Sequence, residues 1–112
     1  MFEGFSQLAS LMKNLPRIRE QAAQLQQRVS EISVEGDAGA GMVKTKVNGR
    51  MELTTLTISE EAWKLNDREM LEDLIKSAVN QALDKARVRV AEETQRLAKE
   101  MGMPELPMPG MG

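Results

Sequence analysis

The first third of the chain carries a heptad pattern of apolar residues. They recur at alternating spacings of three and four, with polar side chains between them: Leu8, Leu11, Leu15, Ile18, Ala22, Leu25, Val29 and Ile32. This spacing predicts a long helix with a coiled-coil-like apolar seam. Pro16 conflicts with a straight helix, because it lacks a backbone donor and clashes with the preceding turn. Since the seam keeps its phase on both sides of Pro16, we expect a kink near residues 12–16 rather than a helix start capped by Asn14.

A glycine-rich connection follows the first helix. Residues 35–42, with the sequence EGDAGAGM, end the helical pattern and predict turns. The segment does not resemble a phosphate-binding loop, because the Walker spacing and its Lys-Ser/Thr pair are missing. We therefore interpret it as a structural connection rather than as a nucleotide site.

Asn48-Gly49 lies between two runs of β-forming residues and is the strongest short signal for a hairpin. A two-residue turn would pair Val47 with Arg50. It would also make these further pairs: Thr45 with Glu52, and Val43 with Thr54. Apolar side chains then fall on both faces: Val43, Val47, Leu56 and Ile58 on one, and Met42, Met51 and Leu53, beside Lys44 and Lys46, on the other. Because a lone hairpin is marginally stable, we add a third strand near residues 32–36 and expect cover on part of the second face.

The second half of the chain predicts a short helical turn over residues 59–63 and then a long helix. Asn66, with Glu69 three residues later, forms a capping box that would start the long helix. An apolar stripe without Pro or Gly then continues to residue 101, which corresponds to a helix of roughly 50 Å. Gly102 is expected to end it.

A helix of that length exceeds a three-stranded sheet, which is only about 17–20 Å along its strands. The distal half of the helix must project into solvent or pack on another chain, and its continuous apolar positions favour a partner. We therefore predict an α+β fold with a small antiparallel sheet and two long helices that works as a homodimer. Residues 1–101 form its single domain, and residues 102–112, rich in Met, Pro and Gly, are expected to be a disordered tail.

Composition argues against catalysis. The chain has no His and no Cys, so it lacks an imidazole base, a thiol nucleophile and a thiolate metal site. Its clustered acids fall at a helix start, where the helix dipole favours negative charge: Glu60, Glu61, Glu69, Glu72 and Asp73. We predict a protein that is not an enzyme and uses no cofactor, metal or small-molecule substrate.

The hydropathy of the chain and its N-terminal sequence indicate the cellular compartment. No apolar run approaches the roughly 18 residues of a membrane span. The start of the chain, MFEGFSQLAS, lacks the basic residues and apolar run of a signal peptide. The absence of cysteine fits a reducing compartment. We therefore predict a cytoplasmic protein with no membrane partner.

Clusters of basic residues are the remaining candidates for a binding site, because they could contact nucleic acid. The net charge of −2 argues against this, since a protein that compacts DNA is usually strongly basic. The clusters lie on the first helix, on the long helix and on the hairpin: Lys13, Arg17 and Arg19; Lys85, Arg87 and Arg89; Lys44, Lys46 and Arg50. One interpretation is a solvated surface with pairs four residues apart, such as Arg89 with Glu93 and Arg96 with Glu100. The other is phosphate contact, which needs no base-reading motif and which dimerisation would double. Composition alone favours the first.

Several long stretches carry a family resemblance. They are the opening MFEGFSQLASLMKN, the central VEGDAGAGMVKTKVNGRMELTTLTIS, the helical DREMLEDLIKSAVNQALDKA and the Met/Pro/Gly tail. In these the chain resembles the YbaB/EbfC family of bacterial nucleoid-associated proteins, although Pro16 departs from the plain helix of its relatives. The resemblance implies an α-β-β-β-α protomer and a tweezer-like homodimer.

The resemblance also implies a partner. It suggests binding of double-stranded DNA with a change in DNA conformation, a location in the nucleoid, and roles in nucleoid organisation and gene regulation, without a cofactor. The residues expected to contact DNA follow from charge and placement: Lys13, Arg17, Arg19, Lys85, Arg87 and Arg89.

An alternative of another class is a protein-interaction or chaperone-like scaffold. The helix–hairpin–helix order with heptads also resembles prefoldin subunits, which clasp protein clients, and the low aromatic content fits that class. Against it, the first helix is short for a prefoldin arm and the block from Gly36 to Gly49 does not match. DNA binding is the leading hypothesis.

Overall fold

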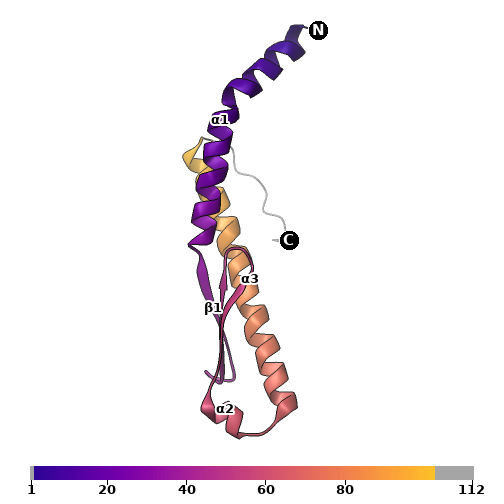
Figure 1. Cartoon of the computed structure of the whole chain (residues 1–112), viewed down its shortest axis with the longest axis vertical. Coiled ribbons are helices and arrows are strands. Elements are labelled where there is room, and N and C mark those ends of the chain that lie inside the picture. The colour runs from indigo at the N-terminus through magenta and orange to yellow at the C-terminus, as the bar shows by residue number, and fades with distance from the viewer. Residues whose placement is uncertain (1, 103–112) are drawn as a thin grey trace.

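The elements follow one another as helix, three strands, short helix and long helix (Figure 1). The computed structural model describes residues 2–102. The elements are α1 (Phe2–Ser30), β1 (Ser33–Ala38), β2 (Val43–Asn48), β3 (Leu53–Ile58), α2 (Glu60–Lys64) and α3 (Arg68–Glu100). The three strands form one antiparallel sheet in the order β1-β2-β3. The predicted α+β class and element order are therefore confirmed, including the third strand, which runs to Ala38.

α1 runs through Pro16 without interruption. Figure 1 shows the helix bending in this region, so that its first half points away from the rest of the molecule. The missing donor and the clash of the proline ring with the preceding turn account for the bend. The prediction of a kink is confirmed, and the alternative start at Asn14 is wrong.

The hairpin register differs from the prediction. Val47 pairs with Leu53 and Val43 with Ile58, so the predicted pairs Val47–Arg50, Thr45–Glu52 and Val43–Thr54 are wrong. The cause is the Asn48 side chain, whose Oδ1 accepts hydrogen bonds from the backbone N of Arg50 at 2.9 Å and of Glu52 at 3.1 Å. These bonds close a longer loop over residues 49–52 in place of a two-residue turn.

α3 packs at close range on β1 and β2, because the contact surfaces are built from small residues. Ala78, Ala82 and Ala86 are fully buried on α3. A Cβ added at Gly36 would lie 2.0 Å from the carbonyl oxygen of Ala78. The buried Thr45 Oγ1 donates to that same oxygen at 2.8 Å. Glycine at 36 is therefore required by the approach of the helix backbone to the sheet.

The outer face of the sheet is polar. Lys44 and Lys46 are exposed and stand opposite Asp37 and Glu35 of β1. The cover expected on this face is therefore wrong. The physical reason is the longer loop, which places Leu53 opposite the buried Val47, on the side of the sheet that α3 occupies.

Both ends of α3 differ from the predictions. Its N-cap is Asp67, whose side chain accepts from the backbone N of Met70 at 3.1 Å, and the cap predicted at Asn66 is wrong by one residue. Its distal half lies beside α1 of the same chain, where Arg28 and Glu100 form an ion pair at 2.5 Å. The predicted alternatives, solvent or another chain, did not include this intramolecular partner.

Candidate nucleic-acid interface

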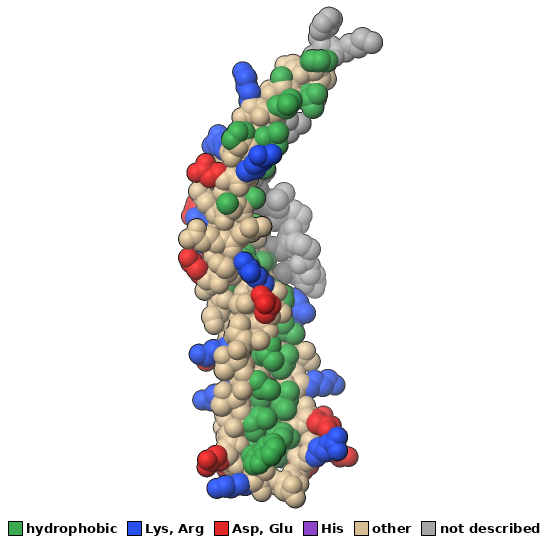
Figure 2. Space-filling view, in the orientation of Figure 1, with side chains coloured by type: hydrophobic (Ala, Val, Ile, Leu, Met, Phe, Trp, Pro, Cys, Tyr) green, Lys and Arg blue, Asp and Glu red, His purple; other side chains and the backbone are tan. Residues whose placement is uncertain are grey.

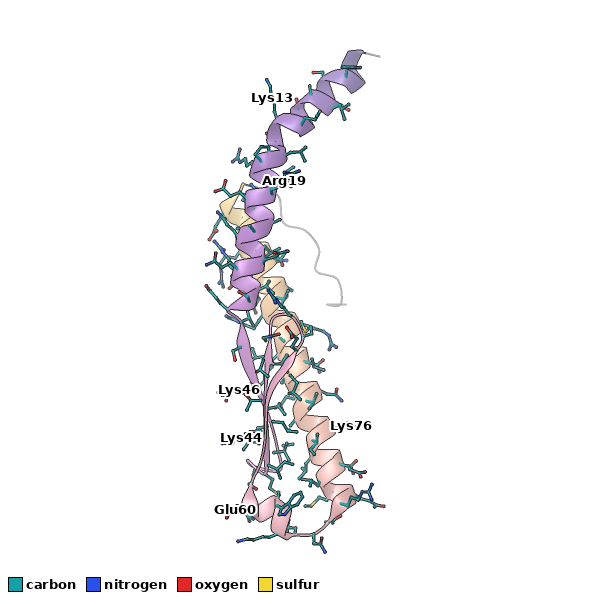
Figure 3. The ribbon with its side chains drawn as sticks, in the orientation of Figure 1. Lys13, Arg19, Lys44, Lys46, Glu60 and Lys76 are labelled. Carbon is teal, nitrogen blue, oxygen red and sulfur yellow. The ribbon has the colours of Figure 1, made fainter. Side chains whose placement is uncertain are left out.

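The basic residues of α1 are exposed and uncompensated. Among the side chains that the structure describes, no carboxylate forms an ion pair with Lys13, Arg17 or Arg19. No Asp or Glu occurs from residue 4 to residue 19, so this stretch carries three positive charges and no negative one. Figure 3 shows Lys13 and Arg19 on the bent part of α1, beyond the sheet.

The three cations do not form one patch. Lys13 and Arg17 are four residues apart and share a side of the helix. Arg19 lies six positions after Lys13, which places it about 120° away around the helix axis at 100° per residue. The structure therefore brings Lys13 and Arg17 together and leaves Arg19 on another side of the same helix.

The three cations of α3 each have a partner within the protomer. The Nζ of Lys85 donates to the carbonyl oxygen of Glu35 at 3.0 Å. Arg87 pairs with Asp84 at 2.7 Å. Arg89 pairs with Glu92 at 4.0 Å rather than with the predicted Glu93. The interpretation as a solvated surface with local ion pairs therefore suits Arg87 and Arg89, whereas Lys85 is held by a distant strand.

Lys85 and Arg89 border a shallow hollow beside Val34 of β1, together with Val88. Arg87, two positions from each of them, lies on a different side of α3. This hollow is separate from the one near the end of α3, where Arg17 lies beside Met101. The structure therefore does not join the two predicted clusters into one surface.

The hairpin cations are also balanced. Lys46 lies 3.7 Å from the Glu35 carboxylate on the neighbouring strand, and Lys44 is in register with Asp37. Arg50 sits in the loop beside the end of α1. The outer sheet face, where Figure 3 labels both lysines, is thus close to neutral.

An ion pair between Arg28 and Glu100 joins the second half of α1 to the end of α3. The hydrogen bond from Arg28 to Glu100 is the main cause that raises the pKa of Arg28. The largely buried Glu93 pairs with Arg96 at 2.5 Å, and not, as predicted, Glu100 with Arg96. The Arg28–Glu100 pair was not predictable from the sequence, because its two residues are 72 positions apart and no local pattern connects them.

An apolar strip lies along the open side of the sheet, where α3 does not cover β3. The strip comprises Leu53, Leu56, Ile58, Trp63, Leu71 and Ile75. Leu56 is 44% exposed and Trp63 is 70% exposed. Figure 2 shows a nearly continuous hydrophobic band along the lower half of the molecule. The sequence did not single out Trp63, because a lone Trp in a short helix does not indicate where its side chain will point.

Two other features were considered: a metal site built from acidic side chains and a helix that could span a membrane. Within residues 2–102, no group of acidic side chains is arranged to hold a metal ion. No helix in the same range is long and apolar enough to cross a membrane.

Comparison with known proteins identifies relatives along nearly the whole chain. The YbaB/EbfC DNA-binding family matches residues 4–101. A nucleoid-associated protein of Clostridium perfringens (strain SM101 / Type A) is 42% identical over 103 residues, which cover 92% of each chain. A nucleoid-associated protein of Anaeromyxobacter dehalogenans (strain 2CP-C) is 37% identical over 94 residues, covering 84% of this chain and 91% of the relative.

A solved structure shares the fold. The uncharacterized protein HP0035 from Helicobacter pylori superposes with a TM-score of 0.61 at 29% sequence identity. The match covers 87% of this chain and 95% of that chain. The fold and the sequence comparisons therefore agree over the same region.

Proposed function

This chain belongs to the YbaB/EbfC DNA-binding family, and we propose that it acts in the bacterial nucleoid as a homodimer that binds double-stranded DNA and alters its conformation. Binding to DNA as a nucleoid-associated protein follows from the family itself. The state of assembly, the duplex form of the DNA and the change in its conformation are the proposed part. Roles in nucleoid organisation and gene regulation are the expected consequence.

The carrying observation is the positive charge without an ion-pair partner on the part of α1 that extends beyond the sheet. Lys13 and Arg17 share one side of the helix and have no acidic partner among the described side chains. Phosphate contacts depend on such local charge, so the overall charge of −2 does not oppose them. We assign the first phosphate contacts to these two residues and a flanking contact to Arg19.

The α3 cations have a secondary place in this proposal. Lys85, Arg87 and Arg89 each have a partner in the protomer, and a phosphate must compete with that partner. We expect their replacement to weaken DNA binding less than replacement of the α1 cations. Contacts of this kind read the backbone, so any sequence preference comes from the shape and deformability of DNA.

The homodimer is proposed to form through the apolar strip. Its members on β3 and α2 are among the most exposed large apolar side chains of the lower half of the molecule, and a second copy offers the same surface. Each partly exposed Leu that becomes buried contributes about 1 kcal/mol, which is part of the value for full burial. A two-fold contact would then leave both α1 helices free to reach DNA.

The family relationship favours this function over the prefoldin-like scaffold. A DNA-binding protein captures other proteins through nucleic acid, whereas a scaffold binds them directly. Partners that remain after nuclease treatment in a pull-down would support the scaffold, and partners that disappear with the nucleic acid support DNA binding.

A salt series tests the proposal directly. Wild-type protein should bind a labelled duplex strongly at roughly 50 mM salt and more weakly toward about 200 mM, because binding releases condensed counterions. Lys13→Ala/Arg17→Ala should weaken binding and reduce the salt slope by about 1 for each phosphate that is no longer neutralised. The matched control is Lys44→Ala/Lys46→Ala, which removes the same charge from the sheet. No binding by the wild type at low salt would refute the proposal.

A further inference from the structure

Arg28 lies on the same side of α1 as the proposed DNA contact Arg17. The two residues are 11 positions apart, which corresponds to about 20° around the helix axis and about 17 Å along it. Both follow Pro16, so the bend of α1 does not come between them. Gln21 and Gln24 fall between them on this side and carry no charge. One segment of α1 therefore carries two guanidinium groups in line.

Lys13 continues this line toward the N-terminus. It lies four positions before Arg17, about 40° around the helix axis. Two acids flank the line, because Glu20 and Glu31 each follow one of the arginines by three positions and lie about 60° to one side. We refer to the three cations, Lys13, Arg17 and Arg28, as the α1 basic row.

Arg28 differs from the other two members of the row in having a carboxylate partner. Its guanidinium lies 2.5 Å from the carboxylate of Glu100 at the end of α3. The two side chains are 31% and 49% exposed, so a solute can reach the pair from solvent. The other acid of α3 that acts on Arg28 is Glu93, which is largely buried and paired with Arg96. Glu100 is therefore the partner that an incoming anion would have to displace.

The end of α3 runs close to the α1 basic row. Met101, the residue after Glu100, lines a hollow together with Arg17 and Gln21. Figure 1 shows the last turns of α3 beside the second half of α1, and the two helices are in contact there. The Glu100 carboxylate thus lies next to the surface that is proposed to face DNA.

We propose that Glu100 is an internal substitute for a DNA phosphate: it pairs with Arg28 in the unbound protein, and a phosphate replaces it when a duplex lies along the α1 basic row. This inference rests on the proposed DNA contacts of α1. Carboxylate and phosphate oxygens both accept hydrogen bonds from the forked donors of a guanidinium, so one can take the place of the other. The contact between Arg28 and Glu100 is then autoinhibitory, and its release adds a further phosphate contact to α1.

An exposed ion pair of this kind is weak enough to be displaced. Pairs between exposed side chains change an equilibrium constant by at most about a factor of five. A duplex carries about one negative charge per 1.7 Å of its axis, so several phosphates compete with the single carboxylate. We therefore expect Glu100 to lower the affinity for DNA without preventing binding.

Glu100→Gln removes the competing carboxylate and tests the proposal. At roughly 50 mM salt it should bind a labelled duplex about 3–10-fold more tightly than wild type. The matched control is Glu72→Gln, which also breaks an Arg–Glu pair on α3 and removes one negative charge, but its partner Arg68 lies at the other end of the helix. The control should stay within about twofold of wild type. Equal affinities of the two variants would overturn the proposal.

Arg28→Gln shows whether the gain depends on Arg28. Combined with Glu100→Gln, it should cancel the gain and reduce the salt slope by about 1 relative to Glu100→Gln alone. In the wild-type background Arg28→Gln should weaken binding less, because DNA there first has to displace Glu100. A loss of equal size in both backgrounds would overturn the proposal.

A purely structural role of the pair predicts the opposite sign. Glu100→Gln would then loosen α1 and bind DNA more weakly than wild type, although far-UV circular dichroism still showed a folded protein, and this result would also overturn the proposal. Failure of the proposed function is distinguishable. If wild type shows salt-dependent binding and Glu100→Gln does not exceed Glu72→Gln, DNA binding stands and the role of Glu100 is refuted. If no variant binds duplex at low salt, both proposals are refuted.

Discussion

Replacing Leu56 with alanine should weaken the proposed homodimer without unfolding the protomer. Leu56 is 44% exposed and lies in the apolar strip, opposite Thr45 of β2. Full burial of a Leu side chain contributes about 1.5–3 kcal/mol, so the part that is still exposed offers about 1 kcal/mol when a second copy covers it. A two-fold interface contains the residue twice, which gives a total of about 2 kcal/mol.

This energy corresponds to roughly a 30-fold increase in the dimer dissociation constant. Sedimentation velocity over a range of concentrations measures that constant. Trp63, the only tryptophan of the chain, provides a second readout, because its 70% exposed indole should emit at shorter wavelength once the strip is covered. The emission of Leu56→Ala should remain at the long-wavelength position up to higher protein concentration than that of wild type.

The matched control is Thr57→Ala, the next residue of β3, which pairs with Lys44 and belongs to the outer face of the sheet. It should leave the dissociation constant within a few-fold of wild type. If Leu56→Ala and Thr57→Ala dimerise equally well, the apolar strip is not the interface. A wild type that stays monomeric at all concentrations, with Trp63 solvent-exposed, would refute the homodimer itself.

Two further substitutions test the packing that positions the helices. Gly36→Ala should lower the free energy of unfolding, measured in urea, by about 2–3 kcal/mol. The reason is that its Cβ would lie 2.0 Å from the Ala78 oxygen, so α3 would have to move off the sheet. An unchanged urea midpoint would contradict this close approach. Asn48→Ala should lower the free energy of unfolding by about 1–2 kcal/mol in the same measurement, because two backbone N–H groups of the loop lose their acceptor. Asn48→Asp keeps an acceptor oxygen and should lose less stability. An equal loss for the two variants would argue against the closure of the loop by Asn48.

Much of the fold was predictable because its signals are local. The heptads indicated α1, the Asn-Gly pair indicated the hairpin, and the uninterrupted stripe indicated α3, with a cap displaced only from Asn66 to Asp67. The register was not predictable from the same signals. It depends on which backbone groups the Asn48 side chain binds, and a turn rule based on residue types assumes a two-residue loop.

The basic clusters were likewise predictable only where the signal is local. That Lys13 and Arg17 share a side follows from helical spacing alone. That Lys85 is held by the Glu35 carbonyl does not, because the two residues are 50 positions apart and meet only once α3 lies on β1. The anchoring of α1 by Arg28 and Glu100 is non-local for the same reason. Charge patterns therefore locate clusters, and the fold decides which of their members remain free.

We propose that the part of α1 that extends beyond the sheet contacts DNA phosphates through Lys13 and Arg17. The most direct measurement is the salt dependence of duplex binding for wild type, Lys13→Ala/Arg17→Ala and Lys85→Ala/Arg87→Ala/Arg89→Ala, followed by fluorescence anisotropy. We expect a linear fall of log affinity with log salt for wild type, a clearly smaller slope for the α1 variant and a lesser change for the α3 variant. A slope and affinity of the α1 variant equal to those of wild type would contradict it.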